Sequence, residues 1–110
     1  MDSEILELLD DILSEAASIQ DFTIEHTFET YSGDKRTRFA VERCFEIIGE
    51  ALNRIGKVDK SILESISNYR AIISFRNLLA HGYDHIEDKI VWGIIESDLK
   101  NLVEDIKRLR

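Results

Sequence analysis

Residues 40–52, with the sequence AVERCFEIIGEAL, place apolar side chains on two faces of one helix. The larger set recurs every three or four residues and continues past this stretch: Val41, Cys44, Phe45, Ile48, Leu52 and Ile55. A second set comprises Ala40, Ile47 and Ala51. Because both faces are apolar, we expect a helix over about 34–55 that is central to the fold or shared with a partner chain. Gly56 is expected to close this helix.

Amphipathic patterns outside this segment predict three more long helices. One has Ser3 as its N-cap, another follows Asn68 and ends at Gly82, and the last begins between Asp84 and Asp88. The last helix carries an apolar stripe at helical spacing: Val91, Ile94, Ile95, Leu99, Leu102, Val103 and Ile106.

Short connections join these helices. Thr23 is a candidate cap for a short helical turn within residues 21–33, which Gly33 interrupts, and Ser61 is expected to open another brief turn. Short connections favour antiparallel neighbours. The sequence therefore predicts an all-α fold, an antiparallel four-helix bundle with a short extra helical turn.

Composition bounds the domain count and the location. A chain of 110 residues with no proline, five glycines and 33% charged residues is typical of a single helical domain, here residues 1–110. Its high surface-to-volume ratio favours self-association. The acidic N-terminus and the lack of an 18-residue apolar run predict a cytoplasmic protein without a membrane segment. Cys44 is the single cysteine, so no internal disulfide or multi-cysteine zinc site is expected, and its position predicts a core residue.

The net charge of −8 argues against a broad nucleic-acid-binding surface, because affinity for phosphate is built from many basic contacts. Basic residues are nevertheless clustered locally. Four lie at the start of the central helix and two along the helix after Asn68: Lys35, Arg36, Arg38, Arg43, Arg70 and Arg76. A small basic cleft in an acidic protein can still hold a short RNA segment.

The stretch RNLLAHGY, residues 76–83, ends an apolar helix with a guanidinium, an imidazole and a phenol. Gly82 is expected just past the helix, which places His81 at its C-terminus. There the helix dipole favours the protonated imidazole while Arg76 opposes it, so we expect His81 to titrate near neutral pH. Arg76 and His81 are five residues apart, about 140° around a helix. They converge only if Arg76 reaches around the helix or a second copy of the chain completes the site.

This spacing resembles the signature of HEPN-domain ribonuclease toxins of the HepT type, which pair with a minimal nucleotidyltransferase antitoxin. The resemblance covers about residues 3–109 and extends to AVER at 40–43, IIGEA at 47–51, FRN at 75–77 and IVW at 90–92. It implies a homodimer with a composite site in the groove between subunits. It also implies a metal-independent endoribonuclease without a cofactor, in which Arg76 and His81 are catalytic and Tyr83 receives AMP from the antitoxin.

The residue types suit that chemistry. RNA carries its own nucleophile, the 2′-hydroxyl, so cleavage requires proton transfer and stabilisation of the charged phosphorane. His81 suits the first task, as base or acid, and the forked guanidinium of Arg76 suits the second. Asn77 is a candidate for orienting these groups. AMP on Tyr83 would add a bulky anion that blocks the cleft and competes with RNA for Arg76.

Simpler interpretations exist for each residue. Arg76 and His81 are also ordinary at a helix end, Tyr83 can merely pack the loop, and Asn77 can be a surface residue. Four potential metal ligands occur near the motif, but Gly82 is expected to separate them: His81, Asp84, His85 and Asp88. Trp92 is expected to pack rather than to stack on a base. The alternative function is a non-catalytic helical subunit that presents substrate or nucleotide to a nucleotidyltransferase.

Overall fold

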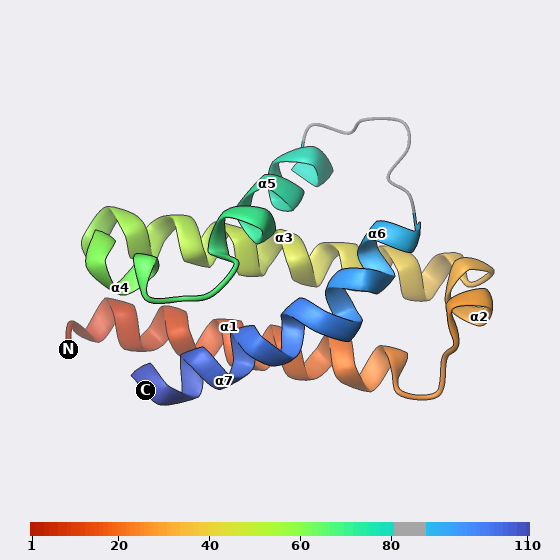
Figure 1. Cartoon of the computed structure of the whole chain (residues 1–110), viewed down its shortest axis with the longest axis horizontal. Coiled ribbons are helices and arrows are strands. Elements are labelled where there is room, and N and C mark those ends of the chain that lie inside the picture. The colour runs from red at the N-terminus through yellow and green to blue at the C-terminus, as the bar shows by residue number, and fades with distance from the viewer. Residues whose placement is uncertain (81–87) are drawn as a thin grey trace.

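The computed structural model describes residues 1–80 and 88–110, and every regular element in them is a helix (Figure 1). The order is α1 (Ser3–Thr23), α2 (Phe28–Ser32), α3 (Lys35–Val58), α4 (Lys60–Glu64), α5 (Tyr69–Ala80), α6 (Asp88–Gly93), the π-helix η1 (Ile94–Asp98) and α7 (Leu99–Leu109). The predicted all-α bundle is confirmed. The extra turn is two short helices, α2 and α4. No helix in these two ranges has the length and apolar character needed to cross a lipid bilayer.

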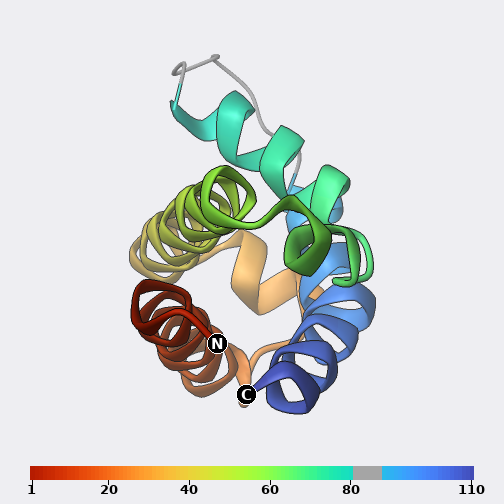
Figure 2. The same cartoon turned by 90° about the vertical axis from the view of Figure 1, so that its left-hand side faces the viewer.

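Helix α3 lies between α1 and α5, as its two apolar faces predicted (Figures 1 and 2). Its buried residues lie on both sides of the helix: Val41, Cys44, Phe45, Ile48, Gly49, Ala51, Leu52 and Ile55. Helices α1, α3 and α7 enclose the main core, whereas α5 packs mainly on α3, on the side away from α1. Burying each large aliphatic side chain stabilises the fold by about 1.5–3 kcal/mol. Helix α3 buries such side chains on both of its faces and therefore connects α1 to α5.

Two helix starts differ from the prediction. Asp2, not Ser3, caps α1, because its carboxylate accepts the backbone N–H of Glu4 at 2.7 Å. Thr23 is the last residue of α1 and is buried, and its hydroxyl donates to the carbonyl of Ile19 at 2.8 Å. The short helix α2 is capped four residues later by Thr27. Threonine suits either position, since its hydroxyl bonds backbone groups inside a helix as well as at its start.

The prediction that Gly56 closes the central helix is wrong. Helix α3 continues to Val58, and a Cβ at position 56 would lie 2.6 Å from Cδ2 of Leu63. Gly56 therefore provides room for the short helix α4. Asp59 both ends α3 and caps α4, accepting the N–H of Ser61 at 3.0 Å, so the predicted cap Ser61 is already inside the helix.

The last helix contains a π-helical turn, Ile94–Asp98, that the sequence analysis did not predict. In a regular helix Leu99 would point about 140° away from Ile94. The wider turn keeps both in the core, where Ile94 is 9% and Leu99 1% exposed. The predicted apolar stripe from Val91 to Ile106 is therefore confirmed. The π-helical turn keeps the part of the stripe before it and the part after it on the same side of the helix.

Candidate active site

Arg76 lies on α5 with the base of its side chain against α3. A Cβ at Gly49 would lie 2.3 Å from Cβ and 2.7 Å from Cγ of Arg76, so any larger residue at 49 would push Arg76 away. The glycine in the middle of α3 thus allows α5 to approach closely at the position of the guanidinium-bearing residue. Neither the charge nor the spacing of the motif indicated this contact.

The guanidinium of Arg76 has a neutral partner. Its Nη1 donates to Oδ1 of Asn77 at 3.1 Å, and Asn77 is exposed. Within residues 1–80 and 88–110, no carboxylate pairs with Arg76. An amide oxygen orients a guanidinium without neutralising its charge.

The other predicted site residues, His81 and Tyr83, lie outside the described residues, as does Gly82. Asp84 and His85 lie there too, so three of the four potential metal ligands, counting His81, are outside the described residues. Across the described ranges, no group of three or more histidine, cysteine, aspartate or glutamate residues is arranged to hold a metal ion.

The basic cluster predicted at the start of α3 divides into residues with different environments. Lys35 and Arg36 are exposed, and the ammonium of Lys35 lies 5.4 Å from the ring centre of Phe39, which is 57% exposed. Arg43 is also exposed but pairs with Glu46 at 3.1 Å. Arg38 is turned away from this surface and bonds to α2 and α6.

Charge is divided unequally along the chain, which the net value of −8 conceals. Residues 1–34 hold ten of the 22 acidic residues and none of the 14 basic ones, so residues 35–110 have a formal net charge of +2. Most of the acidic residues in 1–34 belong to α1, and α1 and α5 lie on opposite sides of α3 (Figure 2). The acidic excess is therefore remote from Arg76. This signal was available in the sequence.

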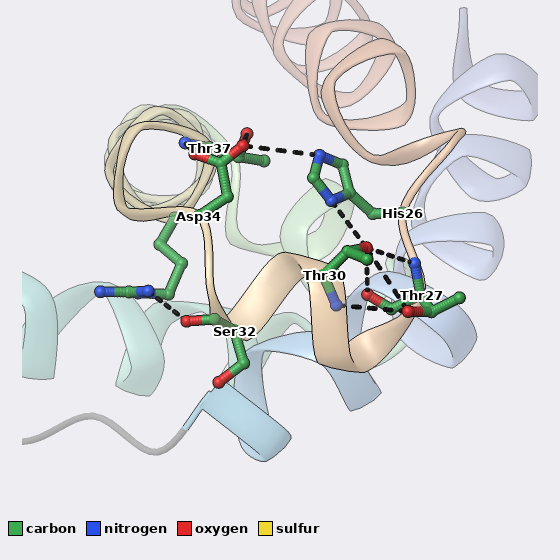
Figure 3. A network of polar contacts seen from close by, with 7 residues as sticks. His26, Thr27, Thr30, Ser32, Asp34 and Thr37 are labelled. Carbon is green, nitrogen blue, oxygen red and sulfur yellow. Dashed lines mark hydrogen bonds and ion pairs between the residues drawn. The ribbon is translucent and has the colours of Figure 1, made fainter.

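A polar network joins the connection between α1 and α2, helix α2 and the start of α3 (Figure 3). Nδ1 of His26 lies 3.0 Å from the Thr30 hydroxyl, and Nε2 lies 3.8 Å from Oδ2 of Asp34. Asp34 caps α3, and hydrogen bonds from the backbone and hydroxyl of Thr37 lower the pKa of its carboxyl. The contacts of His26 are with residues that cap α2 and α3, so this histidine has a structural role.

Two residues interpreted as packing residues are confirmed as such. Trp92 is partly buried, with its ring centre 5.2 Å from that of Tyr31. Cys44 is 6% exposed, and burial raises the pKa of its thiol to about 12. A thiol with such a pKa is a poor nucleophile at neutral pH.

Comparison with known proteins identifies close similarity over nearly the whole chain. The family model described as ribonuclease HepT-like matches residues 12–109. A probable ribonuclease HepT of Thermococcus cleftensis is 34% identical over 102 residues, covering 93% of this chain and 92% of the relative. A Methanocaldococcus jannaschii protein named "Putative RNase" is 30% identical over 112 residues, covering 96% and 87% respectively. No solved structure matches significantly.

Proposed function

This chain belongs to the HepT-like ribonuclease family, and from that premise we propose that it is an endoribonuclease toxin that cleaves RNA without a metal ion. The catalytic residues are Arg76 and His81, with Asn77 in support. The enzyme acts in the cytoplasm of the cell that makes it. The observation that carries the proposal is the environment of Arg76, whose stem lies on Gly49 and whose guanidinium bonds to a neutral amide.

In the proposed reaction the 2′-hydroxyl of RNA attacks the adjacent phosphorus and the bond to the 5′-oxygen breaks. The imidazole of His81 accepts the hydroxyl proton, and the imidazolium that forms then gives a proton to the leaving oxygen. The guanidinium of Arg76 donates two hydrogen bonds to the phosphate oxygens as negative charge increases on them. Proton transfer and stabilisation of the phosphate charge therefore both use side chains of this protein.

A homodimer completes this site. On a regular helix Arg76 and His81 point about 140° apart, so one chain does not readily bring both to one phosphate. Two chains related by a two-fold axis supply two copies of each residue. The composite site then lies in the groove between them, on the side of α3 away from the acidic helix α1.

A nucleotidyltransferase antitoxin is the proposed partner. It transfers AMP from ATP to the phenol oxygen of Tyr83, releasing pyrophosphate. The attached phosphodiester places a bulky anion near the site, where it excludes RNA and competes for Arg76. Tyr83→Phe removes the acceptor oxygen, so this variant should cleave RNA but escape silencing.

Induction in a bacterial host tests the activity. The wild type should arrest growth with RNA breakdown, and Arg76→Ala and His81→Ala should abolish both while remaining folded. For the purified protein, removal of Arg76 should cost about 10²–10³-fold in kcat, and cleavage should persist in EDTA. Normal growth and intact RNA with a folded wild type would favour the alternative, a non-catalytic subunit of a nucleotidyltransferase.

Mixing the two inactive variants tests the composite site. If one site takes Arg76 from one chain and His81 from the other, half of the dimers in an equal mixture carry one intact site out of two. The mixture should therefore regain about a quarter of the wild-type activity after subunit exchange. If each site lies within one chain, the mixture stays inactive although the dimers form.

A further inference from the structure

We propose that Arg38, Ser32 and Asp88 form a junction that fixes the start of α6. Because α6 directly follows residues 81–87, the junction helps to position the part of the chain that carries the proposed catalytic residue His81. Arg38 and Asp88 are positioning residues in this proposal and do not touch the substrate. The catalytic part of the inference rests on the proposed function above.

The junction joins the start of α6 to two consecutive elements, α2 and α3, that lie much earlier in the sequence. The hydroxyl of Ser32, at the end of α2, donates to Oδ2 of Asp88 at 2.7 Å, and Figure 3 shows Ser32 directed toward the start of α6. Nε of Arg38, on α3, lies 3.7 Å from Oδ1 of the same carboxylate. Nη1 of Arg38 donates to the backbone carbonyl of Ser32. Each of the three residues therefore contacts the other two.

The two helices that flank residues 81–87 are each held against α3. On α5, the stem of Arg76 lies on Gly49, four residues before the helix ends at Ala80. After residues 81–87, Arg38 contacts Asp88, the first residue of α6. Arg38 and Gly49 are 11 positions apart on the same helix, which is about 16 Å along its axis. A rigid helix thus sets the separation of the two attachment points.

This ion pair is shielded from solvent more than an ordinary surface pair, so salt screens it less. The side chains of Arg38 and Asp88 are 23% and 29% exposed, and Tyr31 beside Ser32 is fully buried against Trp92. Glu42 lies one helical turn after Arg38. Burial raises the pKa of the Glu42 carboxyl, and the negative charges of Asp88 and Glu46 raise this pKa further. The positive charge of Arg38 lowers it. Arg38 therefore compensates two neighbouring carboxylates, and without it the start of α6 would be repelled from α3.

The chain contains a matched control for this junction. Arg110, which directly follows α7, bonds to Asp10 on α1 through two guanidinium nitrogens, and the longer contact is 3.2 Å. This pair also joins distant helices, but it lies at the other end of the α6–α7 rod (Figure 1). Removing it tests what the loss of an interhelical ion pair does without disturbing the junction.

The experiment compares Asp88→Asn with Asp10→Asn in the full chain, measuring kcat, KM, thermal midpoint and hydrogen exchange at the amides of residues 91–95. Asp88→Asn should lower kcat about tenfold to hundredfold with KM changed less than about twofold, because a small displacement of catalytic groups affects the transition state most. Exchange in α6 should become faster. Asp10→Asn should leave kcat and α6 exchange unchanged.

A double variant separates positioning from general stability. Arg38→Met should reduce kcat as Asp88→Asn does, and combining the two should add little, because both remove the same contact. Arg38→Lys should restore part of kcat relative to Arg38→Met. Equal loss of kcat in Asp10→Asn and Asp88→Asn, or additive losses in the double variant, would overturn the proposal. A wild type that cleaves no RNA would instead overturn the proposed function and with it the catalytic role, and α6 exchange would then decide whether the junction itself exists.

Discussion

The two sides of α3 differ in what they hold. On one side α1 contributes a continuous apolar stripe, and five of its residues are no more than 1% exposed: Ile5, Leu9, Ile12, Ala16 and Ile19. On the other side α5 contributes fewer buried residues, chiefly Ile72 and Phe75, the latter packed edge-on against Phe45 at 5.4 Å. Beside them the stem of Arg76 lies on Gly49.

This difference separates stability from function. Helix α1 has an apolar stripe that faces the core and acidic residues on its other faces, and it carries none of the proposed catalytic residues. The α5 side places a cation through a close helix contact that depends on a missing side chain. We therefore expect substitutions on the α1 side to change stability alone, and substitutions on the α5 side to change stability and cleavage together.

The largest effect is expected from truncating one buried isoleucine on each side. Ile12 and Ile72 are both 0% exposed, so Ile12→Ala and Ile72→Ala should each lower the free energy of unfolding by about 2–5 kcal/mol. Ile72→Ala should also reduce cleavage by the folded protein, because α5 carries Arg76. Urea unfolding and cleavage rates normalised to the folded fraction measure this. Equal specific activity in the two variants would remove the distinction between the sides.

Two glycines of α3 give a sharper version of the same comparison. Gly49→Ala places a Cβ against the rigid base of Arg76, so α5 must shift, at about 1–3 kcal/mol of stability and a clear loss of kcat. Gly56→Ala meets the flexible end of Leu63, which can rotate away, so kcat should be unchanged. Denaturation and RNA cleavage on both variants provide the measurement. Full activity in Gly49→Ala would show that Arg76 tolerates displacement.

The start of α5 provides a pH-dependent test. Asp105 on α7 is 7% exposed, and its Oδ2 accepts the N–H of Ser67 at 2.7 Å. Burial alone would raise its pKa, but hydrogen bonds from Ser67 and the charge of Arg108 hold the pKa below the ordinary 3.8. The stabilisation is therefore present above about pH 4 and is lost as the pH falls through the lower, folded-state pKa.

Asp105→Asn should accordingly lower the free energy of unfolding by about 1–3 kcal/mol at pH 7. The difference from the wild type should shrink progressively as the pH falls below 4. Urea titrations at several pH values test this expectation. A difference that stays constant with pH would mean that the charge of Asp105 is not what stabilises the contact.

The smallest effect is expected at Tyr31. Its hydroxyl is buried and has no hydrogen-bond partner within residues 1–80 and 88–110, and burial raises its pKa. An unpaired buried hydroxyl is unfavourable, so Tyr31→Phe should leave stability unchanged or raise it by up to about 1 kcal/mol. Thermal denaturation measures the change. A clear loss of stability would indicate that the hydroxyl has a partner outside the described residues.

Helix existence was predictable from the sequence, whereas helix ends were less so. The spacing of apolar residues by three and four positions identified the long helices, because helical periodicity depends only on residues that are close in sequence. The residue types of Thr23, Gly56 and Ser61 suit helix ends, but Thr27 and Asp59 hold those positions. Small polar residues and glycine serve helix interiors and ends alike, so type alone does not decide.

For the candidate site, the motif in the sequence supplied Arg76, Asn77, His81 and Tyr83, and the structure adds the contacts that Arg76 makes with Asn77 and Gly49. Gly49 and the Arg38–Asp88 junction were not identified as parts of the site, because each acts on a residue far away in the sequence. The charge division between residues 1–34 and 35–110 was readable and would have weakened the objection based on net charge.

Local periodicity and residue identity are enough to specify the helical class, the two-faced central helix and the family motif. The packing of the helices was needed to reveal that α5 meets α3 at Gly49, that Arg38 turns inward to Asp88 and that the acidic helix lies away from Arg76. Contacts between helices depend on the shape of both surfaces at the point where they cross, and neither surface alone specifies it.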